Sequence, residues 1–433
     1  MKIKIRKIQF GYYSINFLYW FSIALPLALT TLLKMSRGLD LFQISLCMGI
    51  YSLAILILVV PAGGLADTIG RKRVSIAAYG VMALGSFSLL FTFTFPGFLL
   101  VMFLAGVARS FSPGPLDAWF IDELKLVDPD INLQEYLAKA NTIVWLALGT
   151  GLLVGSYIPN IFGHLPADGT HVLEPFSIPI LISAMIQVIL IGLTILLVND
   201  HNQPDRNMDW RDSFAAVPEL VKNGFQESRK NPIIPYLMGA SAAAYLAMAT
   251  LETLWQPFFS ELPGTMNDNS LFYGVVMGGS FLAGMLGNLA ATPINRWVKN
   301  RFGLICAIFL GFEGVMLITL SFQTSVIAAV IFFWLVYISM SVVHSPHMAM
   351  INKEIPSGKR TTILSMETLI GQVGGILGSV VLGYIADKFS IHITWVLGGL
   401  ILMGSIWFYW MADREDRKRK MKEFSCELEQ RYV

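Results

Sequence analysis

"GGLADTIGRKR", residues 63–73, ends a long apolar segment with a short charged turn. Gly70 lets the chain turn sharply. Asp67 stands at a predicted helix end, where it can pair with Arg71 or with other cations across the turn. Lys72 and the arginine that follows it hold the turn on one side of a membrane. The stretch therefore predicts two membrane-spanning helices joined by a compact charged turn.

The composition indicates a membrane protein. Hydrophobic residues make up 55% of the 433 residues and charged residues only 14%, a balance far from that of a soluble domain. Several charge-free stretches are near or above the ~20 residues that cross hydrocarbon as a helix. They cover residues 8–33, 41–66, 176–199, 233–251, 269–295 and 389–412.

Two longer apolar stretches divide into helix pairs. Residues 74–108 are interrupted by Phe-Pro-Gly at 95–97, and residues 302–352 are interrupted near 322–325. The helix after the first interruption is too short to cross before Arg109, so it must continue to about residue 116 with Arg109 inside the membrane. Together with helices at 141–162 and 362–386, the sequence predicts an all-α integral membrane fold with twelve transmembrane helices.

The distribution of Lys and Arg orients these helices. With both termini in the cytoplasm, only Lys34, Arg37 and Lys388 of the 31 Lys and Arg lie on the outer side, while Arg109 is intramembrane. The basic N-terminus precedes an apolar run that is too long for a secretory signal and lacks a convincing small-residue cleavage site. We therefore expect a multi-pass protein of the inner (plasma) membrane with both termini cytoplasmic.

The longest internal hydrophilic stretch divides the helices into six plus six. We expect six-helix bundles at 1–199 and 233–412, a cytoplasmic linker with an amphipathic helix at 200–232, and a cytoplasmic tail at 413–433. The tail is basic and is expected to lie on anionic lipid rather than on nucleic acid.

The two halves look like repeats of each other. "GLLVGSYIPNIF" (151–162) aligns with "GSVVLGYIADKF" (378–389), which matches Gly151 with Gly378, Tyr157 with Tyr384 and Phe162 with Phe389. Parallel six-helix repeats imply a substrate site at the interface between the halves, near the middle of the membrane.

The charged turn resembles the loop signature of the major facilitator superfamily, Gly-x-Leu-Ala-Asp-(Arg/Lys)-x-Gly-Arg-(Arg/Lys). Thr68 stands where that signature has a cation. The matching residues are Gly63, Leu65, Ala66, Asp67, Gly70, Arg71 and Lys72. The resemblance covers nearly the whole chain and implies the family fold, two six-helix pseudo-repeats, and alternating access. It also implies that Gly63, Asp67, Gly70, Arg71 and Lys72 form a conformational latch; the alternative is an anchor for topology alone.

Polar side chains inside the membrane are candidates for a substrate cavity. Arg109 is always charged. Its expected neighbours are Asn16, Tyr19 and Trp20, and on the seventh helix we expect Trp255 and Gln256 near the helix-breaking Pro257. Glycines on the fifth and eleventh helices, Gly149, Gly151, Gly155, Gly371, Gly374, Gly375, Gly378 and Gly383, allow close helix approach, although tight packing alone also explains them.

Asp117, Glu252 and His344 are the candidates for proton coupling, because a carboxylate or imidazole in a low-dielectric site can take and release a proton. The alternative for His344 and for His347 is interfacial packing. Glu367 is expected at a helix interface, and Asp122 is expected to contact cationic loops.

The preferred function is proton-coupled efflux of small amphipathic compounds, mainly because the loop signature and general build resemble drug:proton antiporters. The alternatives are a proton-coupled symporter that imports a nutrient or metabolite and a non-transporting receptor on the same fold. A phosphate loop for ATP is absent, and no nucleophile, base and acid occur together, so we expect no enzyme. The expected partners are a small-molecule substrate, protons and the lipid bilayer, with no nucleic acid and with the protein monomeric.

No cofactor or metal is expected. The three cysteines, Cys47, Cys306 and Cys426, lack metal-ligand spacing. The loop "HLPADGTHVLE" (164–174) carries His164, Asp168, His171 and Glu174, which could bind a metal in principle; a solvated loop is the simpler interpretation.

Overall fold

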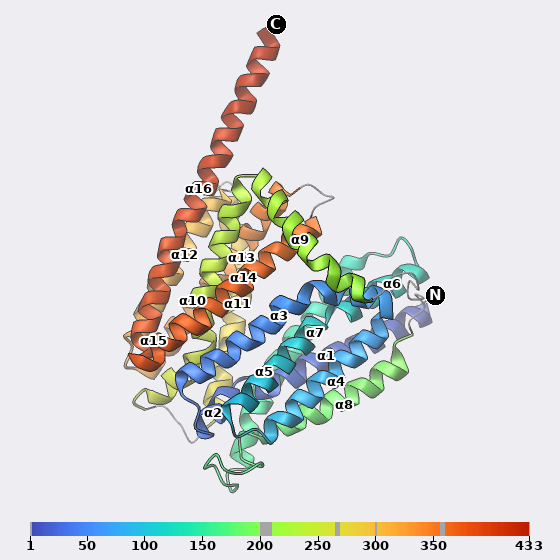
Figure 1. Ribbon diagram of the computed structural model, residues 1–433, viewed down its shortest axis with the longest axis vertical. Helices are drawn as coiled ribbons and strands as arrows, with labels where there is room; N and C mark the ends of the chain where they lie inside the picture. Colours follow the sequence, from blue (N-terminus) through green and yellow to red (C-terminus); the bar gives the residue numbers. More distant parts are fainter. Residues whose placement is uncertain (1, 200–209, 265–268, 299–300, 356–359, 433) are drawn as a thin grey trace. The chain divides into compact units, whose positions relative to one another are not determined.

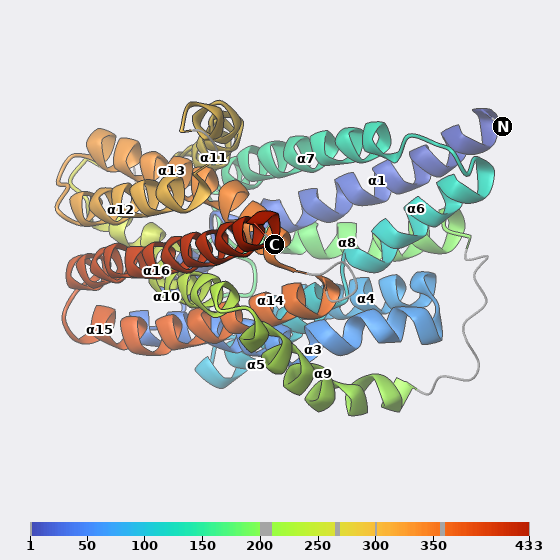
Figure 2. The same cartoon turned by 90° about the horizontal axis from the view of Figure 1, so that it is seen from above.

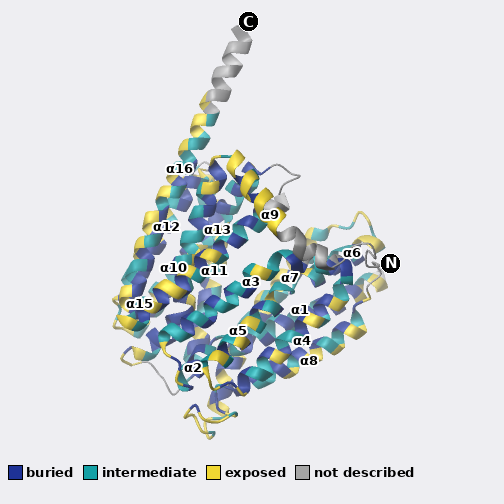
Figure 3. Ribbon diagram, in the orientation of Figure 1, coloured by how far each residue is buried: buried dark blue, intermediate teal, exposed yellow. Residues whose placement is uncertain are grey.

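The computed structural model describes residues 2–199, 210–264, 269–298, 301–355 and 360–432. Within these ranges, 12 helical segments are long and apolar enough to cross a membrane, which confirms the predicted number of spans. Many of their exposed residues are large and apolar, and Leu196 and Ile327 are each 75% exposed. Figure 3 marks the exposed residues in yellow. Such surfaces fit lipid rather than water.

The chain forms two compact units, residues 1–217 with 253–278, and residues 218–252 with 279–433. The first unit contains eight complete helices, coloured blue to green in Figure 1. They are α1 (Lys2–Leu27), α2 (Thr30–Ser36), α3 (Leu41–Ile69), α4 (Arg71–Leu90), α5 (Phe95–Ser110), α6 (Gly114–Val127), α7 (Leu133–Ile161) and α8 (Ile178–Leu197).

Three helices are shared between the units. Helix α9 (Trp210–Lys230) lies within the stretch 200–232. Most of its apolar side chains lie outside the described set, so the amphipathic cytoplasmic linker stays a prediction. Helix α10 (Ile233–Glu261) belongs to the second unit through Glu252 and to the first unit from Thr253. The bundle boundaries expected from the sequence stay a prediction.

The second unit continues with helix α11, which begins in the first unit, and ends with the long α16. Its helices are α11 (Leu271–Trp297), α12 (Phe302–Ser321), α13 (Val326–Glu354), α14 (Arg360–Leu377), the π-helical turn η2 (Gly378–Leu382), α15 (Gly383–Lys388) and α16 (Ile391–Tyr432). Helix α12 packs against both α13 and α16, as Figure 2 shows.

Glycines set the closest helix contacts in each unit. A Cβ at Gly155 of α7 would lie 1.9 Å from the carbonyl oxygen of Leu25 in α1. In the second unit, a Cβ at Gly374 or Gly378 would lie 2.2 Å from a backbone oxygen of α10. No other residue fits at these positions without displacing backbone, so the glycine-rich helices are close-packed, as their sequences predict.

Candidate functional site

Within the charged stretch 63–73, a single residue separates two helices. Helix α3 ends at Ile69 and α4 begins at Arg71, and Gly70 between them has φ 101°. This conformation favours glycine because a Cβ would clash with the backbone. The sharp turn predicted at Gly70 is therefore present.

Arg71 forms an ion pair with Asp122 of α6, so Asp122 contacts a cationic turn, as expected. Lys72 donates a 2.7 Å hydrogen bond to the carbonyl oxygen of Ile195, near the end of α8. The turn therefore holds together α4, α6 and α8 of the first unit. The surroundings of Gly63 and the side chain of Asp67 lie outside the described set, and the function of the latch stays a proposal.

The fourth predicted span is interrupted. Helix α5 ends at Ser110 and α6 begins at Gly114, and together they occupy one candidate span, Phe95–Val127. Pro113 and Pro115 lack backbone N–H groups, which favours a break at this point. The break leaves backbone groups without helical partners inside the membrane, where polar groups are costly unless they are bonded or hydrated.

Arg109 lies at this break. Its guanidinium donates a 2.8 Å hydrogen bond to the carbonyl oxygen of Ser112, and its Cζ lies 5.7 Å from the ring centre of Trp20 on α1. The side chain is nevertheless exposed. A guanidinium that stabilises the break while remaining accessible can also bind a ligand.

Asp117 lies in the first turn of α6 and accepts a hydrogen bond from α1. The Tyr12 hydroxyl donates a 2.7 Å hydrogen bond to Oδ1 of Asp117, and the Tyr12 ring stacks on Phe120 with centroids 3.9 Å apart. The stacked ring fixes the hydroxyl in place. Asp117 is only partly buried, so the protein does not fully enclose this carboxyl group.

The other two residues predicted near Arg109 lie on the same face of α1. Asn16 is 4% exposed and its buried Oδ1 has no protein partner among the described residues. Tyr19 is 1% exposed and packs against Tyr79 of α4, with ring centroids 5.7 Å apart. We name Tyr12, Asn16, Trp20, Arg109 and Asp117 the polar cluster.

Trp255 and Gln256 lie elsewhere in the first unit. Gln256 donates a long 3.4 Å hydrogen bond to the carbonyl oxygen of Leu27, at the end of α1. Trp255 is 1% exposed and packs against Tyr273 of α11, with ring centroids 6.0 Å apart. The structure does not gather these two side chains with Arg109, so their place in a substrate cavity stays a prediction.

The ends of α7 and α11 meet in a second polar contact. Asn160 donates a 2.9 Å hydrogen bond to Asn269, and the Ser270 hydroxyl donates a 2.6 Å hydrogen bond to the carbonyl oxygen of Ser156. A Cβ at Gly274 would lie 1.8 Å from Oγ of Ser156. We name this contact the α7–α11 clasp; it lies at the end of the first unit that carries loop 162–177.

Two of the predicted proton-coupling residues belong to the second unit. The side chains of Glu252 on α10 and His344 on α13 are both exposed, although each residue lies within a candidate membrane span. His344 is one turn from His347, whose ring contacts Glu367 of α14. From the sequence, Glu367 is expected at a helix interface and interfacial packing is the alternative for His347; their contact was not predicted.

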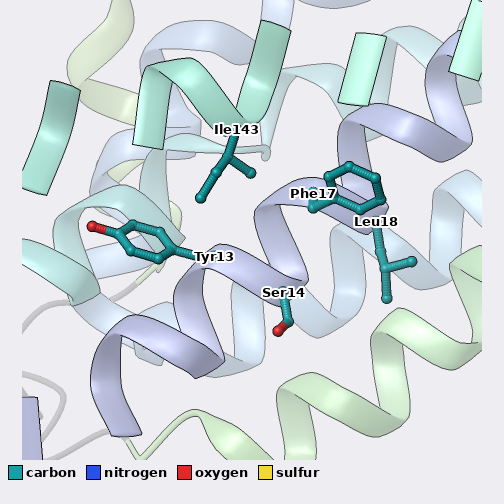
Figure 4. A pocket seen from close by; sticks show the side chains of 5 residues that line it. All are labelled: Tyr13, Ser14, Phe17, Leu18 and Ile143. Atoms are coloured by element: carbon teal, nitrogen blue, oxygen red, sulfur yellow. The ribbon is translucent and has the colours of Figure 1, made fainter. Parts of the chain in front are cut away.

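A pocket of about 390 Å³ lies between α1 and α7 (Figure 4). It is lined by Tyr13, Ser14, Phe17, Leu18 and Ile143. None of the side chains predicted for the substrate cavity lines it.

The loop between α7 and α8 is organised by Asp168. Its Oδ1 accepts a 2.8 Å hydrogen bond from the Thr170 hydroxyl and lies 3.1 Å from Nδ1 of His171. The bonds from Thr170 and His171 lower the pKa of Asp168 to about 2. Within the described part of the chain, no group of three or more His, Cys, Asp and Glu is placed to hold a metal ion.

The family follows from the match to known proteins. A family model described as Major Facilitator Superfamily matches residues 12–379. The chain belongs to the major facilitator superfamily. It is therefore a multi-pass membrane transporter rather than an enzyme, and the resemblance of its charged turn to the superfamily signature is confirmed.

Relatives in other organisms carry the same description. "Uncharacterized MFS-type transporter YxaM" of Bacillus subtilis (strain 168) is 24% identical over 408 residues, which are 92% of this chain and 94% of the relative. "Uncharacterized MFS-type transporter MJ1560" of Methanocaldococcus jannaschii is 22% identical over 362 residues, 82% of this chain and 84% of the relative.

Solved structures of superfamily members share the fold. The nucleoside transporter NupG superposes with a TM-score of 0.72 at 13% identity, covering 94% of this chain and 98% of that one. The peptide transporter POT superposes with a TM-score of 0.71 at 11% identity, covering 95% of each chain. At these identities the likeness establishes the superfamily fold and not the substrate.

Proposed function

We propose that this superfamily member is a secondary active transporter that exports small amphipathic compounds in exchange for protons. The polar cluster is the observation that carries the proposal. It places an accessible cation, Arg109, and a partly accessible carboxyl group, Asp117, beside an interrupted helix within one span. Ionisable groups inside a membrane span are costly and mark transport paths.

The substrate class follows from the side chains around Arg109. Trp20 presents its ring to the guanidinium, and Tyr12 and Tyr19 lie on the same face of α1. An aromatic surface with one cation fits a neutral or anionic compound that has an apolar body. Arg109 and Asp117 lie on either side of the break. Substrate bound at Arg109 therefore changes the electrostatic field at Asp117, which couples substrate binding to proton binding.

Alternating access requires a closed side and a gate that opens. In this proposal both termini are cytoplasmic, the loop 162–177 is outside, and the α7–α11 clasp closes the outer side. The turn with Arg71 and Asp122 is the cytoplasmic latch that forms and breaks in the cycle. Asn160, Ser270 and Arg71 are the residues whose hydrogen bonds and ion pairs support this assignment.

Transport by purified protein in proteoliposomes tests the proposal. An imposed pH difference should drive accumulation of chloramphenicol, which is neutral, or carboxyfluorescein, which is anionic, inside vesicles with an acidic lumen. A nucleoside (uridine) and dialanine belong in the same panel because the named structural neighbours transport nucleosides and peptides. Asp168→Asn, in the loop outside the spans, is the matched control for Asp117→Asn.

The sign of the response distinguishes the alternatives. Accumulation in an alkaline lumen would replace efflux by proton-coupled import. Saturable binding of a panel compound without flux would make the protein a receptor. Flux that ignores the pH difference would leave a transporter without proton coupling.

A further inference from the structure

Four helices of the second unit each contribute one polar side chain to a single cluster. Nε2 of His347 (α13) lies 2.9 Å from Oε1 of Glu367 (α14). The Ser241 hydroxyl (α10) lies 3.0 Å from the same nitrogen and donates a 3.1 Å hydrogen bond to the same carboxylate oxygen. The Tyr409 hydroxyl (α16) lies 2.8 Å from Nδ1 of His347. We name these four residues the His347 cluster.

The side chains of the His347 cluster are largely but not completely buried. The side chains of His347 and Glu367 are 7% and 14% exposed, and Tyr409 is 3% exposed. A carboxylate in such a place is stable only when a partner offsets its charge. Among the described residues, no Lys or Arg forms an ion pair with Glu367, so its partner is a histidine, whose charge is exchangeable.

Both ring nitrogens of His347 have partners in either protonation state. In the neutral ring, the Nε2 hydrogen points to Glu367 and Nδ1 accepts from the Tyr409 hydroxyl. When Nδ1 takes a proton, it donates to the Tyr409 oxygen, and the Tyr409 hydrogen turns away toward Sγ of Cys306, with which Tyr409 also interacts. The Cys306 thiol points its own hydrogen at the carbonyl oxygen of Val343, 3.8 Å away. Each of these hydrogen-bonding groups therefore keeps a partner in both protonation states.

Several other titratable groups surround the His347 cluster. His344 lies one turn away on α13 and is exposed. Glu313 and Cys306 on α12 face Tyr409, and Tyr245 and Glu252 on α10 lie on the Glu367 side. Adding one proton takes the net charge of the His347–Glu367 pair from −1 to zero. A low-dielectric site favours a net charge of zero.

We propose that the His347–Glu367 pair is a second proton site, which binds one proton and releases it in each transport cycle. The proposal rests on the proton coupling proposed above and adds to the site at Asp117. The step is a simple proton transfer: an N–H bond forms as water on one side gives up a proton, and the bond breaks when water on the other side receives it. Ser241 transmits the change to α10, because its hydroxyl serves both members of the pair.

The number of protons moved per substrate tests this site. In proteoliposomes with the membrane potential held at zero by K⁺ and valinomycin, each coupled proton multiplies the limiting accumulation of substrate about tenfold per pH unit. With two sites, wild-type protein should reach about a hundredfold per unit. Glu367→Gln and His347→Asn should lose one factor of about ten, while His392→Asn, which changes a histidine in the first turn of α16, should leave the dependence unchanged.

The two proposals fail in different ways. If wild-type accumulation does not follow the pH difference, proton coupling is wrong and the second site falls with it. If wild-type and Asp117→Asn differ but Glu367→Gln matches wild type, coupling stands and the second site is wrong.

Tyr409→Phe removes one hydroxyl and keeps the ring, so it serves if the other variants do not fold. It should shift the pH midpoint of proton binding, followed by titration of the purified protein. An unchanged midpoint in Tyr409→Phe would overturn the proposal.

Discussion

Arg71, the first residue of α4, is paired with Asp122 of α6, 51 residues later in the chain. The two side chains are 19% and 38% exposed, and a pair with this exposure contributes at most about 1 kcal/mol to stability. Its contact joins the charged turn to the segment that carries Asp117. The free energy of the Arg71–Asp122 pair is therefore too small to decide whether the protein folds, but it can change the balance between states of the transport cycle.

Arg71→Ala and Asp122→Ala should each slow substrate exchange and leave ligand binding intact. Loss of the pair changes the balance between inward-open and outward-open states by at most about 1 kcal/mol, because the latch closes in only one of them. Asp67→Asn, in the same turn, is expected to act similarly. Exchange at equal pH on both sides of the vesicle measures the effect.

The control for these variants is Glu135→Ala, which removes an exposed ion pair with Lys139 on α7. The double variant of Arg71 and Asp122 should be no slower than either single variant. Additive slowing would show that the two residues act separately, and wild-type exchange in all of them would leave the turn as a topology anchor.

Asp117→Asn should lose the part of the pH response that depends on Asp117, a factor of about ten in accumulation per pH unit, and keep exchange at equal pH, because an amide cannot take up a proton. Tyr12→Phe removes the 2.7 Å hydrogen bond to Asp117 but leaves the carboxyl group, so it should shift the pH dependence without abolishing the response. Both are measured by accumulation against an imposed pH difference. A wild-type response in Asp117→Asn, and in the double variant with Glu252→Gln, would remove these carboxylates from coupling.

Gly155→Ala should destabilise the protein by about 1–3 kcal/mol, since the added methyl group meets the backbone of Leu25 and forces α1 and α7 apart. Gly149 is the matched control on the same helix, because a Cβ there has nothing within 4 Å. Gly149→Ala should be neutral or gain about 0.5–1 kcal/mol. Thermal unfolding followed by size-exclusion chromatography compares the two, and equal melting temperatures would contradict the packing argument.

Much of the fold was predictable because hydrophobic length is a local property of the sequence. Span limits agree within a few residues for most helices, such as 302–321, which the structure gives as Phe302–Ser321. The break between Ser110 and Gly114 was not predicted, although Ser-Pro-Gly-Pro at 112–115 carries the signal. The length needed to cross the membrane favours one continuous helix there, so the interruption was not expected.

The site was predictable only where a residue is unusual in itself. Arg109 is a cation in an apolar span, so the sequence alone placed it in the membrane, and the structure puts Trp20 beside it. The partner of Arg71 is 51 residues away, and the contact of His347 with Glu367 joins residues 20 apart on two different helices. Such contacts depend on packing, which one sequence does not reveal.

Orientation can be tested with single cysteines in a background that lacks Cys426, since Cys47 and Cys306 are buried. Ala167→Cys, exposed in the loop after α7, should react with an impermeant thiol reagent in intact cells. Asn223→Cys, exposed on α9, should react only after the cells are opened. The reverse pattern would place the termini outside.

Acid should loosen the loop around Asp168. A pKa of about 2, below the ordinary 3.8, means that the folded loop favours the ionised carboxylate. Its stabilising hydrogen bonds are therefore complete above pH 4 and are lost as the pH falls toward 2. Cleavage of the loop by pepsin should rise over this range relative to Asp168→Asn, which lacks the charge at every pH. A constant ratio would contradict the expectation.

Helix α16 runs without interruption for 42 residues, a length of about 63 Å, whereas hydrocarbon is only about 30 Å thick. Roughly half of this helix, drawn red in Figure 1, therefore continues beyond the lipid as a straight rod. A small rigid protein fused to it in helical register would keep a fixed orientation. Such a fusion would give electron microscopists an alignment mark on a 48.0 kDa membrane protein that otherwise has little mass outside the bilayer.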